Sequence, residues 1–393
     1  MMIRTLNRRK LLALVLSISL LLTGCWDRIE INDIAIVLAI AVDKEKDGNI
    51  RVSLEIPLAS QLGGTQGGGG GTGGSGRADY IDSEIAPTFV QAYAQLQDRM
   101  SRRLKFGHYR VLIIGEEMAR SGIEDVFDIV ARRPENRLSS YMIVAKGTAE
   151  SLMKSQPKLE RFSGEAIREM VKQGEIVPTN VKNTAMSLSH YGSDAVLPYM
   201  GVKKLKEKDS KGTEEIELLG YAQFLEDRMV DVMARESAMG LSWLKNNIRP
   251  ITVVVNLNKP ENLIFTVIRS NAKIEPIVEQ DGRLRFDIRI DARLRLNENK
   301  SKEDLTNRLV MEKVKKHAAD NIRLQVMDTI RLIQKSGADS AELGLKLFRK
   351  DPITWKKLEP NWRELLKEAE FDVKVKADIS EFGLISENIV RGG

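Results

Sequence analysis

The sequence predicts an α/β and α+β multidomain fold, with a mixed-sheet N-terminal domain followed by an α+β C-terminal domain with antiparallel strands and one long helix. Short apolar stretches alternate with helical stripes between residues 35 and 160, which is typical of an α/β layer. Residues 284–296 alternate apolar and charged side chains without a break, as in an antiparallel strand with one face in the core. A long helical stripe then runs from 305 to 335.

These patterns divide the chain into four segments. We expect a lipoprotein signal peptide over 1–24, an N-terminal α/β domain over 25–202, a charged linker or loop over 203–215 and a C-terminal α+β domain over 216–393. Segment 203–215 is rich in lysine, glutamate and aspartate, a composition that is usual for a solvated loop.

The leader combines a cationic start, a short apolar core and a small-residue cleavage site. Its apolar block, 11–22, is shorter than the ~20 residues that a membrane span needs, and its layout is that of a secretory signal. The motif Leu22-Thr23-Gly24-Cys25 closes the leader, and Cys25 is the only cysteine of the chain. We expect the Cys25 thiol to take a diacylglyceryl group, so that two acyl chains anchor the mature protein stably to a membrane.

The composition is that of a globular protein, with 393 residues, of which 42% are hydrophobic and 30% charged. The formal net charge is +6, and four of the cations lie in the leader, which leaves about +2 for the mature chain. So weak a charge gives no reason to expect a nucleic-acid partner. With Cys25 lipidated, no free thiol remains for a disulfide, so core burial must supply the stability.

The N-terminal domain opens with a predicted hairpin. In 35–43 small residues alternate with larger ones, which predicts a strand buried on both faces, with a helix on the side of the small residues. Residues 50–56 are the second strand, with Arg51, Ser53 and Glu55 expected on a wet face. The glycine-rich segment 63–76 lacks the Lys-Ser/Thr pair of a phosphate-binding loop, so we expect a flexible surface loop inside the domain.

Helices and strands alternate through the rest of this domain. Apolar stripes predict the helices, and short apolar runs predict the strands. In chain order they are helix 89–100, strand 109–114, helix 123–132, strand 141–145, a helix from 148, and helices 163–172 and 184–190.

The C-terminal domain is expected to begin with a hairpin and to end on a strand. Ser301 and Asp304 resemble a capping box at the start of the long helix, and Gly337 ends that helix. The other elements expected are hairpin 215–225 with 229–233, helix 234–245, strands 251–257, 263–277 and 284–296, short helices 343–348 and 361–366, and strand 371–379.

Few residues suggest catalysis. His108 lies at the entrance of a predicted strand, but His190 and His317 are in unrelated segments, so we expect a structural His108 and no metal site. The pairs Glu116-Glu117 and Glu214-Glu215 could exchange protons, but in a chain with 55 acidic residues a surface role is the simpler expectation. We therefore expect neither enzyme activity nor a cofactor.

The chain resembles the Ger(x)C family, the C-subunit lipoproteins of bacterial spore germinant receptors. The matching stretches follow the family's order along nearly the whole mature chain. They are Gly24-Cys25-Trp26-Asp27 with Glu30-Ile31-Asn32; Phe106-Gly107-His108 running into Leu112-Ile113-Ile114-Gly115-Glu116-Glu117; Leu219-Gly220-Tyr221-Ala222-Gln223-Phe224 with Glu236-Ser237-Ala238-Met239-Gly240-Leu241-Ser242-Trp243-Leu244; and the tail from Trp362 through Glu370-Phe371-Asp372-Val373-Lys374-Val375 to Gly383. Segment 63–76 departs from the family in being longer and richer in glycine.

The resemblance implies a lipid-anchored C subunit of a nutrient germinant receptor, acting in spore germination. Such a subunit would work by contact with two integral-membrane subunits, of the A and B classes, at the outer face of the spore inner membrane. The alternative is a lipid-tethered solute-binding protein that captures a small nutrient. Solute binders usually have two similar α/β halves, whereas the halves predicted here differ, which favours the receptor subunit.

Overall fold

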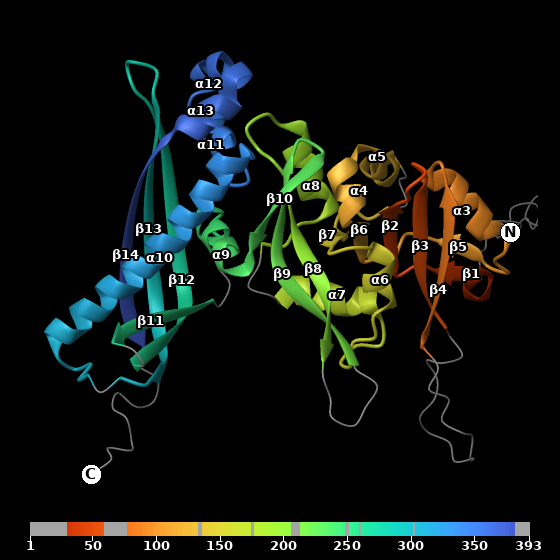
Figure 1. Ribbon diagram of the computed structural model, residues 1–393, viewed down its shortest axis with the longest axis horizontal. Coiled ribbons are helices and arrows are strands. Elements are labelled where there is room, and N and C mark those ends of the chain that lie inside the picture. The colour runs from red at the N-terminus through yellow and green to blue at the C-terminus, as the bar shows by residue number, and fades with distance from the viewer. Residues whose placement is uncertain are drawn as a thin grey trace, which may run out of the picture.

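The computed structural model describes residues 30–58, 77–132, 136–173, 177–205, 213–247, 251–258, 261–301 and 303–381. The signal peptide 1–24, Cys25 and the glycine-rich segment 63–76 lie outside these residues. The described chain forms two large sheets that follow one another along the long axis of the molecule, with helices packed on each (Figure 1). The predicted fold class is confirmed. None of the described helices is long and apolar enough to cross a membrane.

The first sheet is mixed, with the strand order β10-β9-β8-β7-β6-β2-β3-β4. Its parallel centre consists of β2 (Ala39–Lys44), β6 (Val111–Gly115), β7 (Tyr141–Ala145) and β8 (Val196–Leu205). Antiparallel strands extend it on both sides, with β3 (Ile50–Pro57) and β4 (Asp79–Ala86) at one edge and β9 (Thr213–Leu225) and β10 (Arg228–Ala234) at the other. A small parallel pair, β1 (Ile34–Ile36) with β5 (Arg103–Lys105), follows the 3-10 turn η1 (Ile31–Asp33).

Helices cover both faces of this sheet. As predicted from the small residues of β2, α6 (Ala149–Lys154) and α7 (Ser163–Gln173) pack on the face that carries Ala39 and Ala41. The opposite face belongs to a second apolar cluster that includes residues of α3 (Phe89–Asp98), α4 (Glu116–Ser121), α5 (Glu124–Arg132) and α8 (Val181–Ser189).

The prediction that one face of β3 is exposed to water is wrong. Ser53 and Glu55 are both 0% exposed. The N-terminus of α7 lies against Glu55, and the Ser53 hydroxyl accepts a hydrogen bond from Ser83 of β4 at 2.9 Å. β4 itself has no counterpart among the predicted elements.

The predicted hairpin 215–225 with 229–233 forms, but its strands β9 and β10 belong to the first sheet. β8 and β9 pair antiparallel on either side of the charged segment, which therefore joins two neighbouring strands of one sheet. The next helix, α9 (Arg235–Leu244), buries Leu241 and Trp243 in an apolar cluster that runs from the α6–α7 face of the first sheet to the second sheet.

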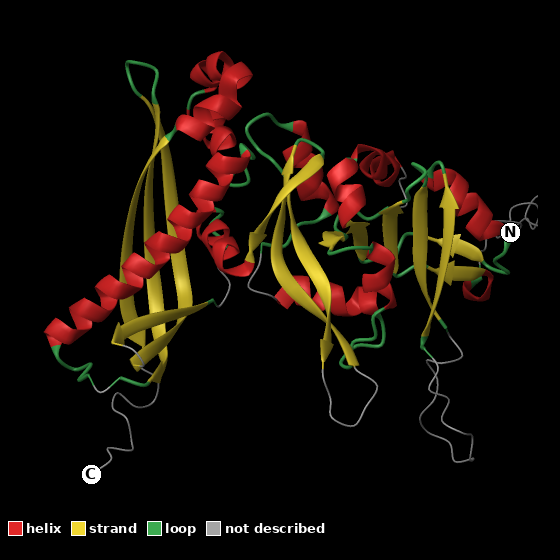
Figure 2. Cartoon of the chain, viewed as in Figure 1, coloured by secondary structure: helices red, strands yellow, loops and turns green. Residues whose placement is uncertain are grey.

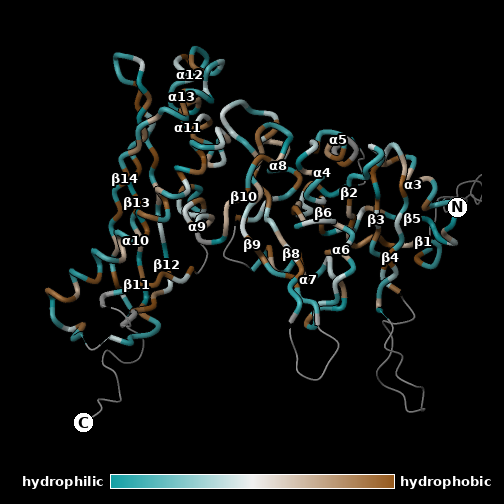
Figure 3. The backbone as a smooth tube through the Cα atoms, viewed as in Figure 1, coloured by the Kyte–Doolittle hydropathy of each residue, from teal (hydrophilic) through white to brown (hydrophobic). Residues whose placement is uncertain are grey.

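The second sheet has the order β11-β12-β13-β14. Its strands are β11 (Thr252–Asn258), β12 (Glu261–Val278), β13 (Leu284–Asn299) and β14 (Glu370–Glu381). The first three are antiparallel, and β14 is parallel to β13, because the chain crosses over between them through the long helix α10 (Arg308–Ser336). Figure 3 shows teal and brown alternating along these strands, the pattern of one core face and one water face.

The long helix α10 crosses the core face of the second sheet (Figure 2). It begins after Asn307, whose side chain accepts a hydrogen bond from the Leu309 N–H at 2.9 Å, so the predicted capping box at Ser301 and Asp304 is wrong. Gly337 ends the helix in the left-handed conformation, at φ 72°, as predicted. The short elements α11 (Leu343–Lys350), α12 (Pro352–Leu358), η2 (Glu359–Asn361) and α13 (Trp362–Glu368) lead back to β14.

Candidate functional site

The residues singled out for possible chemistry lie apart from one another. His108 is exposed in the turn before β6, and the described residues contain no group of three or more His, Cys, Asp or Glu placed to hold a metal ion. Cys25 lies outside the described residues, so its lipidation stays a prediction.

The acidic pairs make structural contacts. Glu116 accepts hydrogen bonds from the Tyr199 hydroxyl at 2.8 Å and from the Gly147 N–H at 3.3 Å, and it pairs with Arg120 at 2.9 Å. Burial by itself would raise the pKa of Glu116, but these contacts outweigh burial and hold the pKa below its ordinary value. Glu117 is exposed, and Glu214 forms a surface ion pair with Lys204 at 3.8 Å.

Two buried carboxylates of the first sheet close the N-termini of helices. Asp43, at the end of β2, accepts the N–H groups of Ala149 and Glu150 at 2.6 and 2.9 Å. Glu55 accepts the N–H groups of Ser163 and Gly164 at 2.9 and 3.0 Å, and burial raises its pKa to about 7. Free N–H groups at a helix start need such acceptors, so the two carboxylates have a structural use. For Asp43, an acidic residue at the end of an otherwise apolar strand was the available signal in the sequence, whereas Glu55 lies in a strand that alternates polar and apolar residues.

A third group of buried charges joins the two sheets. The Asp194 carboxylate, before β8, accepts the Asp339 N–H at 2.7 Å and pairs with Arg363 at 3.3 Å. Asp339 is 0% exposed and accepts hydrogen bonds from the N–H groups of Leu343 and Gly344 at 2.8 and 2.7 Å and from the Trp362 indole at 3.2 Å. Burial raises the pKa of both carboxyl groups, that of Asp339 to about 7.

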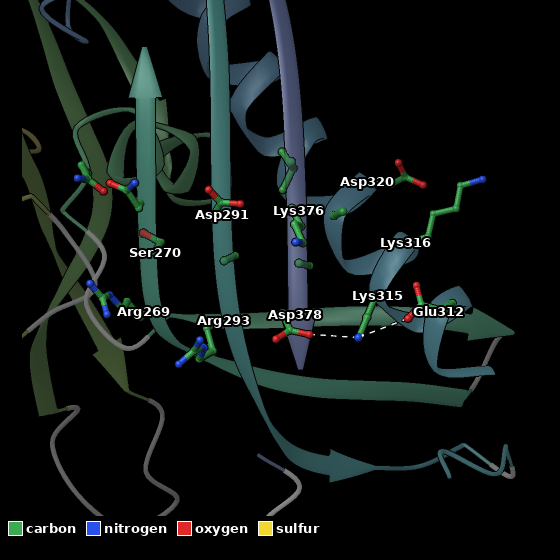
Figure 4. Close-up of a pocket in the computed structure, with 16 residues that line it drawn as sticks. Arg269, Ser270, Asp291, Arg293, Glu312, Lys315, Lys316, Asp320, Lys376 and Asp378 are labelled. Carbon is green, nitrogen blue, oxygen red and sulfur yellow. Dashed lines mark hydrogen bonds and ion pairs between the residues drawn. The ribbon is translucent and has the colours of Figure 1, made fainter. Parts of the chain in front are cut away.

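An open hollow lies on the second sheet. It is an open depression of about 1160 Å³ that spans β12, β13 and β14 and reaches the flank of α10. Figure 4 shows its charged lining, in which Lys315 of α10 pairs with Asp378 of β14 at 3.1 Å and with Glu312 at 3.4 Å. The ion pair with Asp378 is the main reason that the pKa of Lys315 is raised.

The lining of this depression suits contact with charged groups better than catalysis. Arg269, Arg293 and Asp378 lie in one cross-strand row, and Asn271, Asp291 and Lys376 form the next row. The side chains are exposed and carry both signs of charge, whereas small-molecule sites are mostly apolar and enclosed. The alternation of β13 was predictable from its own residues, but the rows depend on the register of three strands, which no local pattern determines.

Comparison with known proteins gives matches along nearly the whole chain. A family model described as "Spore germination protein N-terminal domain" matches residues 27–202, and one described as "Spore germination B3/ GerAC like, C-terminal" matches residues 219–383. YfkR of Bacillus subtilis (strain 168) is 35% identical over 377 residues, which cover 96% of this chain and 97% of that protein. Spore germination protein KC of the same organism is 25% identical over 405 residues, with 96% and 97% covered.

A solved structure shares the fold. The crystal structure of the GerBC protein superposes with a TM-score of 0.55 at 16% sequence identity, covering 86% of this chain and 96% of that one. The match extends over both sheets of the chain, so the arrangement described above is a known fold.

Proposed function

Because this chain belongs to the Ger(x)C family of spore germination proteins, we propose that it is the lipid-anchored C subunit of a nutrient germinant receptor. It acts by contact with membrane-embedded partner subunits of the A and B classes, at the outer face of the spore inner membrane. The observation that carries this proposal is the family match over both halves of the chain, together with the predicted leader 1–24 that directly precedes Cys25.

The anchor places the folded body close to the membrane. Only residues 26–29 separate Cys25 from Glu30, and the first turn and strand follow immediately at Ile31 and Ile34. Five residue steps span at most about 18 Å even when fully extended. A body confined to so thin a layer meets membrane partners at high effective concentration, so a modest interface suffices.

The described residues provide surfaces for contact more clearly than a reaction centre. The buried carboxylates Asp43, Glu55 and Asp339 are held by backbone N–H groups, and the hollow on the second sheet is open and charged. We therefore propose a role without catalysis. The alternative, a solute-binding protein, is less well supported, because an eight-stranded mixed sheet and a four-stranded sheet under one long helix do not make two similar halves.

The experiment that tests this proposal replaces the anchor. Cys25→Ala should weaken germination triggered through this receptor, because the body is no longer held at its partners. An unrelated transmembrane anchor in place of the lipid should restore much of the response. Normal germination of the Cys25→Ala spores would contradict the proposal, and a defect that the new anchor leaves unrepaired would show that the lipid does more than tether.

A further inference from the structure

One face of the second sheet carries charged side chains that are arranged in rows across the strands. We use the term outer face for the side chains of β12, β13 and β14 that point away from α10. Lys273, Arg289 and Lys374 stand opposite one another in one row, and Arg269 stands opposite Arg293 two rows further on. Like charges directly opposite each other destabilise a sheet. The cations of these rows that have no ion pair within the chain therefore weaken the folded protein unless something outside it neutralises them.

Five of the cations have no ion pair within the described part of the chain. They are Arg269, Lys273, Arg289, Arg293 and Lys376, which we call the basic patch; all five are exposed. The nearest acidic row, Glu275, Asp287 and Asp372, is already paired with Lys350, Arg285 and Lys374 at 3.3, 3.1 and 2.7 Å. Two carboxylates stand beside these five cations: Asp291 opposite Lys376, and Asp378 opposite Arg293. The outer face thus keeps a local surplus of positive charge.

Contacts within the chain occupy parts of the edges of the second sheet. Along β14, Arg323 of α10 donates to the Val373 carbonyl at 3.2 Å, and Lys315 pairs with Asp378 at 3.1 Å. Along β12, beyond β11, Asn246 accepts the Ala272 N–H at 3.1 Å and Lys350 donates to the Pro276 carbonyl at 2.8 Å. These contacts hinder the addition of a strand along β14 and along the part of β12 beyond β11, whereas no described helix covers the outer face (Figure 2).

We propose that the basic patch binds an acidic segment of a membrane-embedded protein partner, which rests on the proposed function. From standard sheet spacings the patch measures about 13 Å along the strands and about 10 Å across them, and a helix has a diameter of about 10–12 Å. One acidic helix or loop therefore covers it. A uniformly anionic bilayer fits less well, because it would repel Asp291 and the adjoining acidic row, whereas a protein surface can match both signs of charge.

Binding of a defined peptide tests the chemistry of the patch. The full mature chain in neutral detergent is titrated with a labelled peptide of alternating glutamate and alanine, and with the same peptide carrying glutamine for glutamate. We expect the acidic peptide to bind, its affinity to fall as NaCl is raised, and the glutamine peptide not to bind. Lys273→Glu combined with Arg289→Glu should lower the affinity about tenfold, the equivalent of about 1.4 kcal/mol.

Three controls keep this result interpretable. Lys182→Glu combined with Lys356→Glu makes the same charge change at exposed lysines elsewhere and should leave binding unchanged. Lys273→Gln combined with Arg289→Gln should weaken binding less than the glutamate pair does, with an unchanged circular dichroism spectrum. Vesicles of phosphatidylglycerol are added as competitor. No peptide binding, equal losses in the control pair, or binding to the vesicles in place of the peptide would each overturn the proposal.

Germination of spores separates this inference from the proposed function. If both Cys25→Ala and the patch variant slow germination while the control pair does not, both proposals hold. If only Cys25→Ala slows it, the subunit role stands and the patch is not the docking surface. If neither slows it, the proposed function itself fails.

Discussion

Asp339 offers the sharpest test of how the two sheets are held together. The substitution Asp339→Ala removes the acceptor of three donors, the N–H groups of Leu343 and Gly344 and the Trp362 indole, at a site that is 0% exposed. A buried donor left without a partner costs about 1–3 kcal/mol. Since water can enter a truncated site and satisfy some of the donors, we expect a loss of about 3–6 kcal/mol in the free energy of unfolding at pH 5.

The loss should depend on pH in a defined direction. Burial raises the pKa of Asp339 from 3.8 to about 7, so the folded state binds a proton more readily than the unfolded state. The resulting stability is fully present below pH 3.8 and disappears as the pH rises through about 7. Between pH 5 and pH 8 the wild type therefore loses stability that the alanine variant does not lose, and the difference between their free energies of unfolding should shrink by about 2–3 kcal/mol.

Urea unfolding at the two pH values measures both effects. Trp355 and Trp362 lie close together, with ring centroids 5.0 Å apart, and report the unfolding of this region by fluorescence. Asp351→Ala is the matched control, because Asp351 caps α12 nearer the surface and its loss should cost about 1 kcal/mol. A loss for Asp339→Ala no larger than that of the control, or one that grows with pH, would refute the reasoning.

Four further outcomes are expected. Glu55→Gln should flatten the fall in stability that the wild type shows as the pH rises from about 4.5 to about 7, measured by urea unfolding; an unchanged slope would exclude Glu55 as its source. Gly240→Ala should lower the melting temperature, because a Cβ there would collide with the side chain of Thr329, and overpacking costs about 1–3 kcal/mol; an unchanged melting temperature would contradict this close approach. Mass spectrometry of the mature amino terminus should find the acyl mass on Cys25, and an unmodified Cys25 in membranes would end the anchor hypothesis. Deleting residues 67–74 should leave the unfolding free energy nearly unchanged, since halving a flexible loop alters closure by about 0.6 kcal/mol; a loss of several times that amount would show a structured segment.

The elements that local patterns determine were predictable. Buried and more exposed side chains alternate strictly along β13 from Leu284 to Leu296. The apolar stripe of α10 ends before Gly337, which adopts φ 72°. In each case a single period of side chains decides the structure, with no need to know the neighbouring element. The helix on the small-residue face of β2 was predictable for the same reason.

Features that depend on which elements meet were not predictable. Glu55 looks like a surface residue in its own strand, and only the N-terminus of α7 explains its burial. The membership of β9 and β10 in the first sheet, and the parallel pairing of β14, depend on long-range contacts. The basic patch likewise needs the register of three strands, since no short stretch of sequence places Lys273 opposite Arg289.

The central claim, a lipid-anchored subunit that works by docking, is tested most directly by purifying the full-length chain from spore membranes in mild detergent. The account predicts that two multi-span membrane proteins of the A and B classes copurify with it in fixed proportion, and that the basic-patch variant loses them while the control pair of lysine substitutions retains them. A chain that is fully lipidated and folded but elutes alone, with no membrane protein in fixed proportion, would contradict the account.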